Sequence, residues 1–268
     1  MESARQILPH IRLIRFDDDT FVFPRSVIEE FVREYPARIG LPFDILMHPD
    51  AYNEEILGML QKVGLCHMQV GIQSASPDEL EESFERKGSS QGILALKRSA
   101  LKLGIATTFD IILDNPLASR ADKEATLDLL LRMPRPFNLN MFSLTAYPKS
   151  ETATKLLEAG FITEDDIEGR ATKSFRQYRL TLDYPRPAEE TFYASLISLT
   201  SKGFVPRGLI HWLGRMSFLR RRPGPVRLLA QAANGIKLAW VALSLIRRGE
   251  MSLSRWREYV TRGGWLVQ

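Results

Sequence analysis

Cysteine is almost absent from this sequence, since Cys66 is the single one among 268 residues. One thiol cannot form an internal disulfide, and it cannot build a metal site made of cysteines alone. Cys66 stands at the start of an apolar run that has the pattern of a buried strand. We therefore expect it to be a small, unreactive core residue.

A long apolar stretch is absent from the first 25 residues, which instead carry several charged side chains, among them Arg5, Arg12 and Arg15. A secretory signal needs an uninterrupted apolar segment of about 7 to 15 residues. We therefore expect a cytoplasmic protein.

Acidic residues are scarce near the carboxyl terminus. Residues 202–262 contain 13 Lys and Arg but only Glu250 and Glu258, so this segment carries +11 although the whole chain carries +4. A basic region of this kind favours an anionic partner, either a membrane surface or nucleic acid.

Five short apolar or aromatic runs predict β-strands, with helical patterns between them. The strands are expected at Arg12–Phe16, Phe43–Met47, His67–Ile72, Thr107–Leu113 and Phe137–Leu144. Strands alternating with helices predict an α/β fold with a parallel sheet, open or closed into a barrel. Gly64 and Gly104 follow two of the helical patterns and can supply the left-handed residue that ends a helix.

Polar residues follow each predicted strand, where parallel α/β folds place their ligand sites. They are Asp17 to Asp19, His48 and Asp50, Gln73 and Ser74, Asp114 and Asn115, and Ser143 and Thr145. We expect them to form one ligand-binding edge of the sheet. The three aspartates leave a magnesium site open as an alternative, whereas His48 and His67 have no second ligand at metal spacing and are expected to be ordinary hydrogen-bonded histidines.

The order of these segments resembles the radical S-adenosylmethionine (SAM) superfamily, in particular the group that carries an additional cobalamin-binding domain. The resemblance covers about residues 11–163. It rests on Ile14–Phe21, Gly71–Ser74, Arg86 ahead of Ser89, Asp110–Pro116 and Ala146–Ser150.

This resemblance implies a partial (β/α) barrel in which about five of the family's six β/α units are present. The unit with the Cys-x-x-x-Cys-x-x-Cys loop, which holds a four-iron four-sulfur (4Fe-4S) cluster, is missing. By resemblance, the cofactor is SAM, with Asp17 and Asp18 near its methionyl amino group, Gln73 and Ser74 near its ribose and Arg86 near its carboxylate. Asp114 and Asn115 complete the expected cofactor-binding set, which includes no metal ligand. The partner would be the missing cluster-binding portion, and cobalamin would need the further domain.

We divide the chain into a barrel, residues 1–163, and a basic, mainly helical extension, residues 164–268. Helices are expected over Val205–Leu219 and Pro225–Arg248, and the second presents a broad apolar face with Trp240. Two interpretations of this face stay open: it lies on an anionic membrane, making the protein peripheral to the membrane, or it packs on the barrel or a missing domain. Nucleic acid is the least favoured partner, because the basic residues are interleaved with aliphatic ones.

Three functions are compatible with these observations. The first is an enzyme that cleaves SAM reductively or transfers a methyl group by radical chemistry. The second is a degenerate or split half that binds a partner without chemistry, because Leu117, Ala118 and Ser119 replace the x-Glu-Thr turn of the family. The third is a magnesium-dependent barrel enzyme that uses Asp17 to Asp19.

The scarcity of cysteine generates a first prediction. The chain alone, reconstituted anaerobically with iron and sulfide, should hold no four-iron cluster, because it offers one thiolate where three are needed. Iron analysis and visible absorption measure this, and the Cys66→Ala variant should behave as the wild type does. Stoichiometric iron with the broad absorption of a cluster in the wild type would contradict the prediction.

Overall fold

The computed structural model describes residues 10–17, 20–84, 89–171, 186–249 and 252. Its centre is a five-stranded sheet in the order β1-β2-β3-β4-β5, and every neighbouring pair is parallel. The strands are β1 (Ile14–Phe16), β2 (Phe43–Met47), β3 (Leu65–Gln73), β4 (Ala106–Leu113) and β5 (Asn138–Ser143). The predicted α/β fold with five parallel strands is confirmed, with strand bounds within three residues of those expected.

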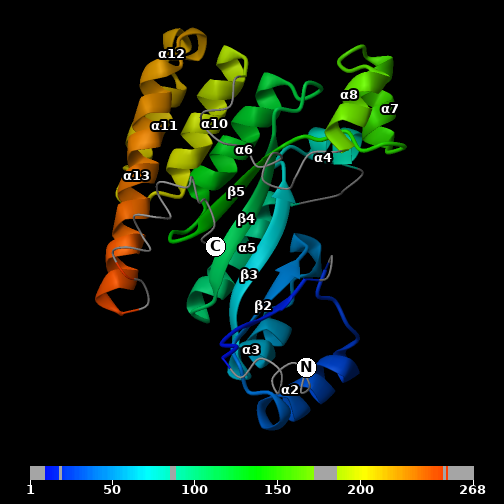
Figure 1. Ribbon diagram of the computed structural model, residues 1–268, viewed down its shortest axis with the longest axis vertical. Coiled ribbons are helices and arrows are strands. Elements are labelled where there is room, and N and C mark those ends of the chain that lie inside the picture. The colour runs from blue at the N-terminus through cyan, green and yellow to red at the C-terminus, as the bar shows by residue number, and fades with distance from the viewer. Residues whose placement is uncertain (1–9, 18–19, 85–88, 172–185, 250–251, 253–268) are drawn as a thin grey trace.

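Helices connect the strands and continue beyond the sheet (Figure 1). They are α2 (Arg25–Arg38), α3 (Glu54–Lys62), α4 (Pro77–Phe84), α5 (Ser90–Lys102), α6 (Arg120–Arg132), α7 (Glu151–Glu158), α8 (Glu164–Ala171), α10 (Ala188–Thr200), α11 (Arg207–Gly214), α12 (Ser217–Arg221) and α13 (Gly224–Arg247). Gly64 and Gly104, after α3 and α5, adopt φ +119° and +70°. They are the left-handed residues expected at these helix ends.

One face of the sheet forms the main hydrophobic core. Ile45, Met68, Val70, Phe109 and Ile111 alternate along the three central strands and are fully buried. Helix α3 packs on β3 and α5 packs on β4, so this face is covered by the connecting helices. Side chains alternate between faces along a strand, and the intervening residues therefore lie on the opposite face.

Helix α10 joins the carboxyl-terminal helices to the sheet layer. It packs on α6 and on α13 (Figure 1), and each residue from Thr191 to Thr200 is buried. Residues of α10, α11 and α13 belong to the same hydrophobic core as the sheet. The helical extension therefore lies directly against the barrel-like layer.

The expected single helix over Val205–Leu219 is wrong. The chain forms α11 and α12 instead, separated by Arg215 and Met216, and Met216 has extended backbone angles. Gly214 ends α11, where the low helix propensity of glycine favours a break. The expected helix over Pro225–Arg248 is confirmed as α13.

Lys97 is an ionisable side chain inside this core. It is 1% exposed, and its Nζ donates to Thr107 Oγ1 at 2.8 Å. Burial lowers the pKa of Lys97 to about 8, well below the value of about 10.4 expected in an unfolded chain. Between these two values the unfolded chain binds more protons than the folded one, so stability rises with pH.

The second prediction follows from this linkage. Lys97→Met should remove the stability gain that the wild type shows as pH rises from about 8 to about 10, a difference of roughly 2–3 kcal/mol. Urea unfolding followed by circular dichroism at a series of pH values measures it. Lys62→Met, at an exposed position on α3, is the matched control and should follow the wild type. Parallel curves for Lys97→Met and the wild type would contradict the prediction.

Candidate functional site

All five strands run in one direction, so their carboxyl ends meet at one edge of the sheet. Gln73, at the end of β3, and Asp114, just after β4, both have left-handed backbone angles, with φ +65° and +57°. Each such residue costs on the order of 1 kcal/mol unless it is glycine. The pairing of β3 with β4 also shifts register between Gly71 and Gln73. The strained residues of the sheet therefore lie at this edge.

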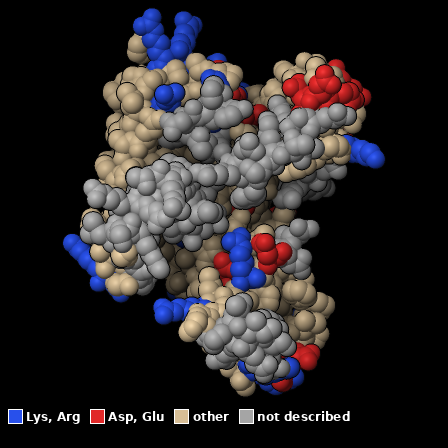
Figure 2. Space-filling model, in the orientation of Figure 1, with Lys and Arg blue, Asp and Glu red and all other residues tan. Residues whose placement is uncertain are grey.

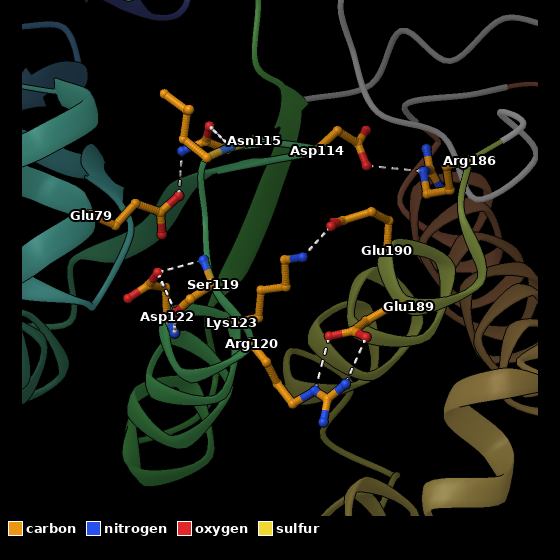
Figure 3. Close-up of polar contacts among 11 residues, drawn as sticks. Glu79, Asp114, Asn115, Ser119, Arg120, Asp122, Lys123, Arg186, Glu189 and Glu190 are labelled. Carbon is orange, nitrogen blue, oxygen red and sulfur yellow. Dashed lines mark hydrogen bonds and ion pairs between the residues drawn. The ribbon is translucent and has the colours of Figure 1, made fainter. Parts of the chain in front are cut away.

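A buried carboxyl group beneath the edge links two strand ends. Glu79, in α4, is 7% exposed, and its Oε2 accepts from Ser74 Oγ at 2.6 Å. Its Oε1 accepts from Asn115 Nδ2 at 2.9 Å (Figure 3). Burial raises the pKa of Glu79, and the two hydrogen bonds act in the opposite direction. Glu79 thus ties the turn after β3 to the turn after β4.

The same turns are attached to α6. Ser76 Oγ donates to Asp122 Oδ1 at 2.5 Å, and Ala75 N donates to Thr126 Oγ1 at 3.0 Å. Asp122 also belongs to the capping box of α6, where it accepts from Ser119 N at 2.7 Å. The backbone that carries Gln73 is therefore supported by two helices.

Asp114 connects the edge to the segment before α10. Its Oδ2 accepts from Ser143 Oγ at 2.6 Å, and its Oδ1 lies 3.3 Å from Nε of Arg186, whose side chain is 2% exposed. Beside this contact, Arg120 donates to both carboxylate oxygens of Glu189 at 3.1 Å, and Lys123 pairs with Glu190 (Figure 3). These ion pairs hold the amino ends of α6 and α10 together next to the edge.

The predicted site residues divide into three groups. Gln73 and Asp17 lie at the edge, half-buried and exposed respectively. Ser74 and Asn115 are 1% and 2% exposed and engage Glu79, while Asp114 engages Ser143 and Arg186. Asp18 and Arg86 lie outside the described residues, so their roles stay predictions.

The face of the sheet opposite the helices carries a row of polar side chains that the sequence analysis did not predict. Gln69 Nε2 donates to Asp110 Oδ2 at 2.7 Å, Asn140 Nδ2 donates to Asp110 Oδ1 at 2.9 Å, and Arg15 pairs with Gln69. The row thus crosses β1, β3, β4 and β5. The polar residues His67, Gln69 and Gln73 at alternate positions of β3 were the signal that could have revealed it.

His67 belongs to this polar face. Its Nε2 lies 2.9 Å from Thr108 Oγ1, and its Nδ1 lies 3.5 Å from Asp44 Oδ2. Burial lowers the pKa of His67, although Asp44 acts in the opposite direction. The expectation of a hydrogen-bonded histidine is confirmed.

The expectation that Cys66 is a core residue is wrong, because its side chain is exposed. Asp44 pairs with His67 while Phe43 pairs with Leu65, so Cys66 stands at a register shift. Desolvation of the sulfur and the charge of Asp44 raise the pKa of the thiol. Among the described residues, no group of three His, Cys, Asp or Glu side chains could hold a metal ion.

The third prediction concerns Glu79. Because burial raises the pKa of this carboxyl group, the wild type should lose stability relative to Glu79→Gln as pH rises above the ordinary pKa of a glutamate, about 4.3. Glu79→Ala should instead lower the free energy of unfolding by roughly 2–4 kcal/mol, since Ser74 and Asn115 lose a buried partner. Chemical unfolding of both variants measures these effects. Glu81→Gln, at an exposed position of the same helix, is the control, and equal pH profiles for it and Glu79→Gln would contradict the prediction.

No protein-family model and no curated protein sequence matches this chain. Among solved structures, it is similar to coproporphyrinogen III oxidase (HemN) from Escherichia coli, a radical SAM enzyme, at 17% identity over 63% of this chain and 37% of HemN, with a TM-score of 0.45. It is also similar to the cobalamin-dependent radical SAM enzyme OxsB, at 17% identity over 62% of this chain and 25% of OxsB, with a TM-score of 0.44.

A further similarity extends over most of the chain. The radical SAM methyltransferase TsrM from Kitasatospora setae, with cobalamin and a four-iron four-sulfur cluster bound, matches at 16% identity with a TM-score of 0.51. The match covers 87% of this chain and 54% of TsrM, so the chain spans about half the length of that enzyme. The five-stranded parallel α/β structure described above therefore has the fold of the radical SAM partial barrel.

Proposed function

We propose that this chain supplies the SAM-binding edge of a radical SAM enzyme. The observation that carries the proposal is the fold, which matches TsrM over 87% of the chain. Parallel β/α folds bind their ligands at the carboxyl edge of the sheet. In this chain that edge combines strained backbone, polar side chains and a rigid support from Glu79.

Gln73 and Asp17 are the residues that we propose to contact the cofactor. The Gln73 amide can both donate to and accept from ribose hydroxyls. The Asp17 carboxylate is exposed, with Arg15 Nε 3.3 Å from its Oδ1. Its other oxygen can accept a charge-assisted hydrogen bond from the methionyl ammonium group. Ser74 and Asn115, whose side chains point to Glu79, would act by positioning the backbone of the edge.

The iron–sulfur cluster does not fit this chain alone. Three thiolates are required, whereas the sequence holds only Cys66, and the pKa of that thiol is raised. We therefore propose that the cluster-binding cysteines, and cobalamin if the reaction uses it, belong to another polypeptide segment that completes the site. The chemical step is then a property of the assembled protein.

The fourth prediction tests the edge directly. The folded chain should bind SAM saturably without the cluster, and Gln73→Ala should weaken binding by about tenfold, the loss expected for one or two hydrogen bonds. Isothermal titration calorimetry measures both affinities. Gln61→Ala, at an exposed position of α3, is the matched control and should leave the affinity unchanged.

Two outcomes would contradict this proposal. Equal affinities for Gln73→Ala and the wild type would remove Gln73 from the site. An absence of SAM binding by a chain with a cooperative unfolding transition would favour a non-catalytic half that binds only a partner protein.

A further inference from the structure

The polar side chains near the middle of helix α13 point toward the rest of the protein. Asn234 lies 3.3 Å from Ser198 Oγ of α10, and Lys237 Nζ donates to Asn138 Oδ1 of β5 at 2.7 Å. Val226, Ala230 and Ala233 are buried on the same side. The inner side of the helix therefore contains the polar groups found near its middle.

The outer side of α13 is apolar. Leu228, Ile236, Trp240 and Leu243 recur at helical spacing and are 65%, 57%, 71% and 50% exposed. Between Arg227 and Arg247 the helix has one charged residue, Lys237, which binds Asn138. A helix on the surface of a water-exposed protein usually has the opposite arrangement, with its polar face outward.

Helices α11 and α12 also expose apolar side chains. Helix α12 packs against α13, and Trp212 and Phe218 of α11 and α12 are 56% and 61% exposed. We call the exposed apolar side chains of α11, α12 and α13 the outer apolar surface. It comprises Leu209, Trp212, Phe218, Leu228, Ile236, Trp240, Val241 and Leu243.

Charge of one sign borders the outer apolar surface. Residues 203–249 contain nine Lys and Arg and no Asp or Glu. Arg221, Arg222 and Arg227 lie near the start of α13, and Arg247 and Arg248 lie at its end. Figure 2 shows basic side chains at both ends of the α13 side of the molecule. This arrangement is complementary to a surface that is apolar inside and anionic at its boundary.

We propose that the outer apolar surface lies in the interface of a membrane that contains anionic lipids. Apolar helices with tryptophan and flanking arginine bind in this region, with the apolar groups below the headgroups and the arginines among them. Helix α13 is long and apolar enough to cross a bilayer. It does not cross one here, because Asn234 and Lys237 attach it to α10 and β5. This inference does not depend on SAM binding.

The fifth prediction is tested by co-sedimentation of the full chain with two kinds of vesicle, phosphatidylcholine alone or mixed with phosphatidylglycerol. The chain should bind the anionic vesicles more tightly, and salt should weaken that binding. Trp240→Glu should weaken it by about tenfold or more, because a charge would enter the apolar layer. R221Q and R222Q should each weaken binding to anionic vesicles by about fivefold and leave binding to neutral vesicles unchanged.

Leu101→Glu is the matched control, since Leu101 is 44% exposed on α5, away from the outer apolar surface. It should bind as the wild type does, and circular dichroism verifies that each variant is folded. Equal binding to both kinds of vesicle, or equal losses for Leu101→Glu and Trp240→Glu, would overturn the proposal. Self-association that Trp240→Glu abolishes, without lipid binding by the wild type, would also overturn it and assign the surface to a second copy of the chain.

Discussion

The parallel pairing of the five strands is the constraint on which the rest of the structure depends. Parallel strands need a crossover after each strand, and the strands of this sheet follow one another in sequence order. Right-handed crossovers therefore place the connecting helices on one face, and all strand ends emerge at one edge. That edge gathers residues that are about 40 positions apart in the sequence, such as Gln73 and Asp114. The opposite face of the sheet carries the row of polar side chains that begins with Arg15 on β1 and ends with Asn140 on β5. The candidate site therefore depends first on the common direction of the strands, which brings these residues together, and then on the individual side chains.

The sequence was sufficient to predict the elements but not the direction of the side chains that follow them. Apolar runs located all five strands, because a strand that packs against a helical layer has apolar side chains at alternate positions. Ser74 and Asn115 were also found at strand ends, yet their engagement with Glu79 depends on α4, which folds back beneath the edge. Arg186 reaches Asp114 from 72 residues away. Contacts of this kind depend on tertiary packing, which local patterns do not report.

Electrostatics divide the molecule into two regions of different character. Near the carboxyl edge, each described cation between α6 and α10 faces a carboxylate, as in the pairs formed by Arg120 and Lys123. Residues 203–249, which include α11, α12 and α13, contain nine Lys and Arg and no Asp or Glu. Helix α10 contacts both regions, with Glu189 and Glu190 at one end and Ser198 against α13. One buried helix thus connects the candidate cofactor edge with the candidate membrane surface.

The three-membered contact of Ser74, Glu79 and Asn115 restricts how this sequence can change over evolutionary time. Loss of Ser74 or Asn115 leaves a buried carboxylate oxygen of Glu79 without its hydrogen bond, and loss of Glu79 removes a hydrogen bond from both donors. Each single substitution is therefore costly. An apolar replacement becomes tolerable only when all three positions change, which makes intermediates rare. Descendants of this chain should therefore keep the trio or replace it as a unit, whatever becomes of the chemistry at the edge above it.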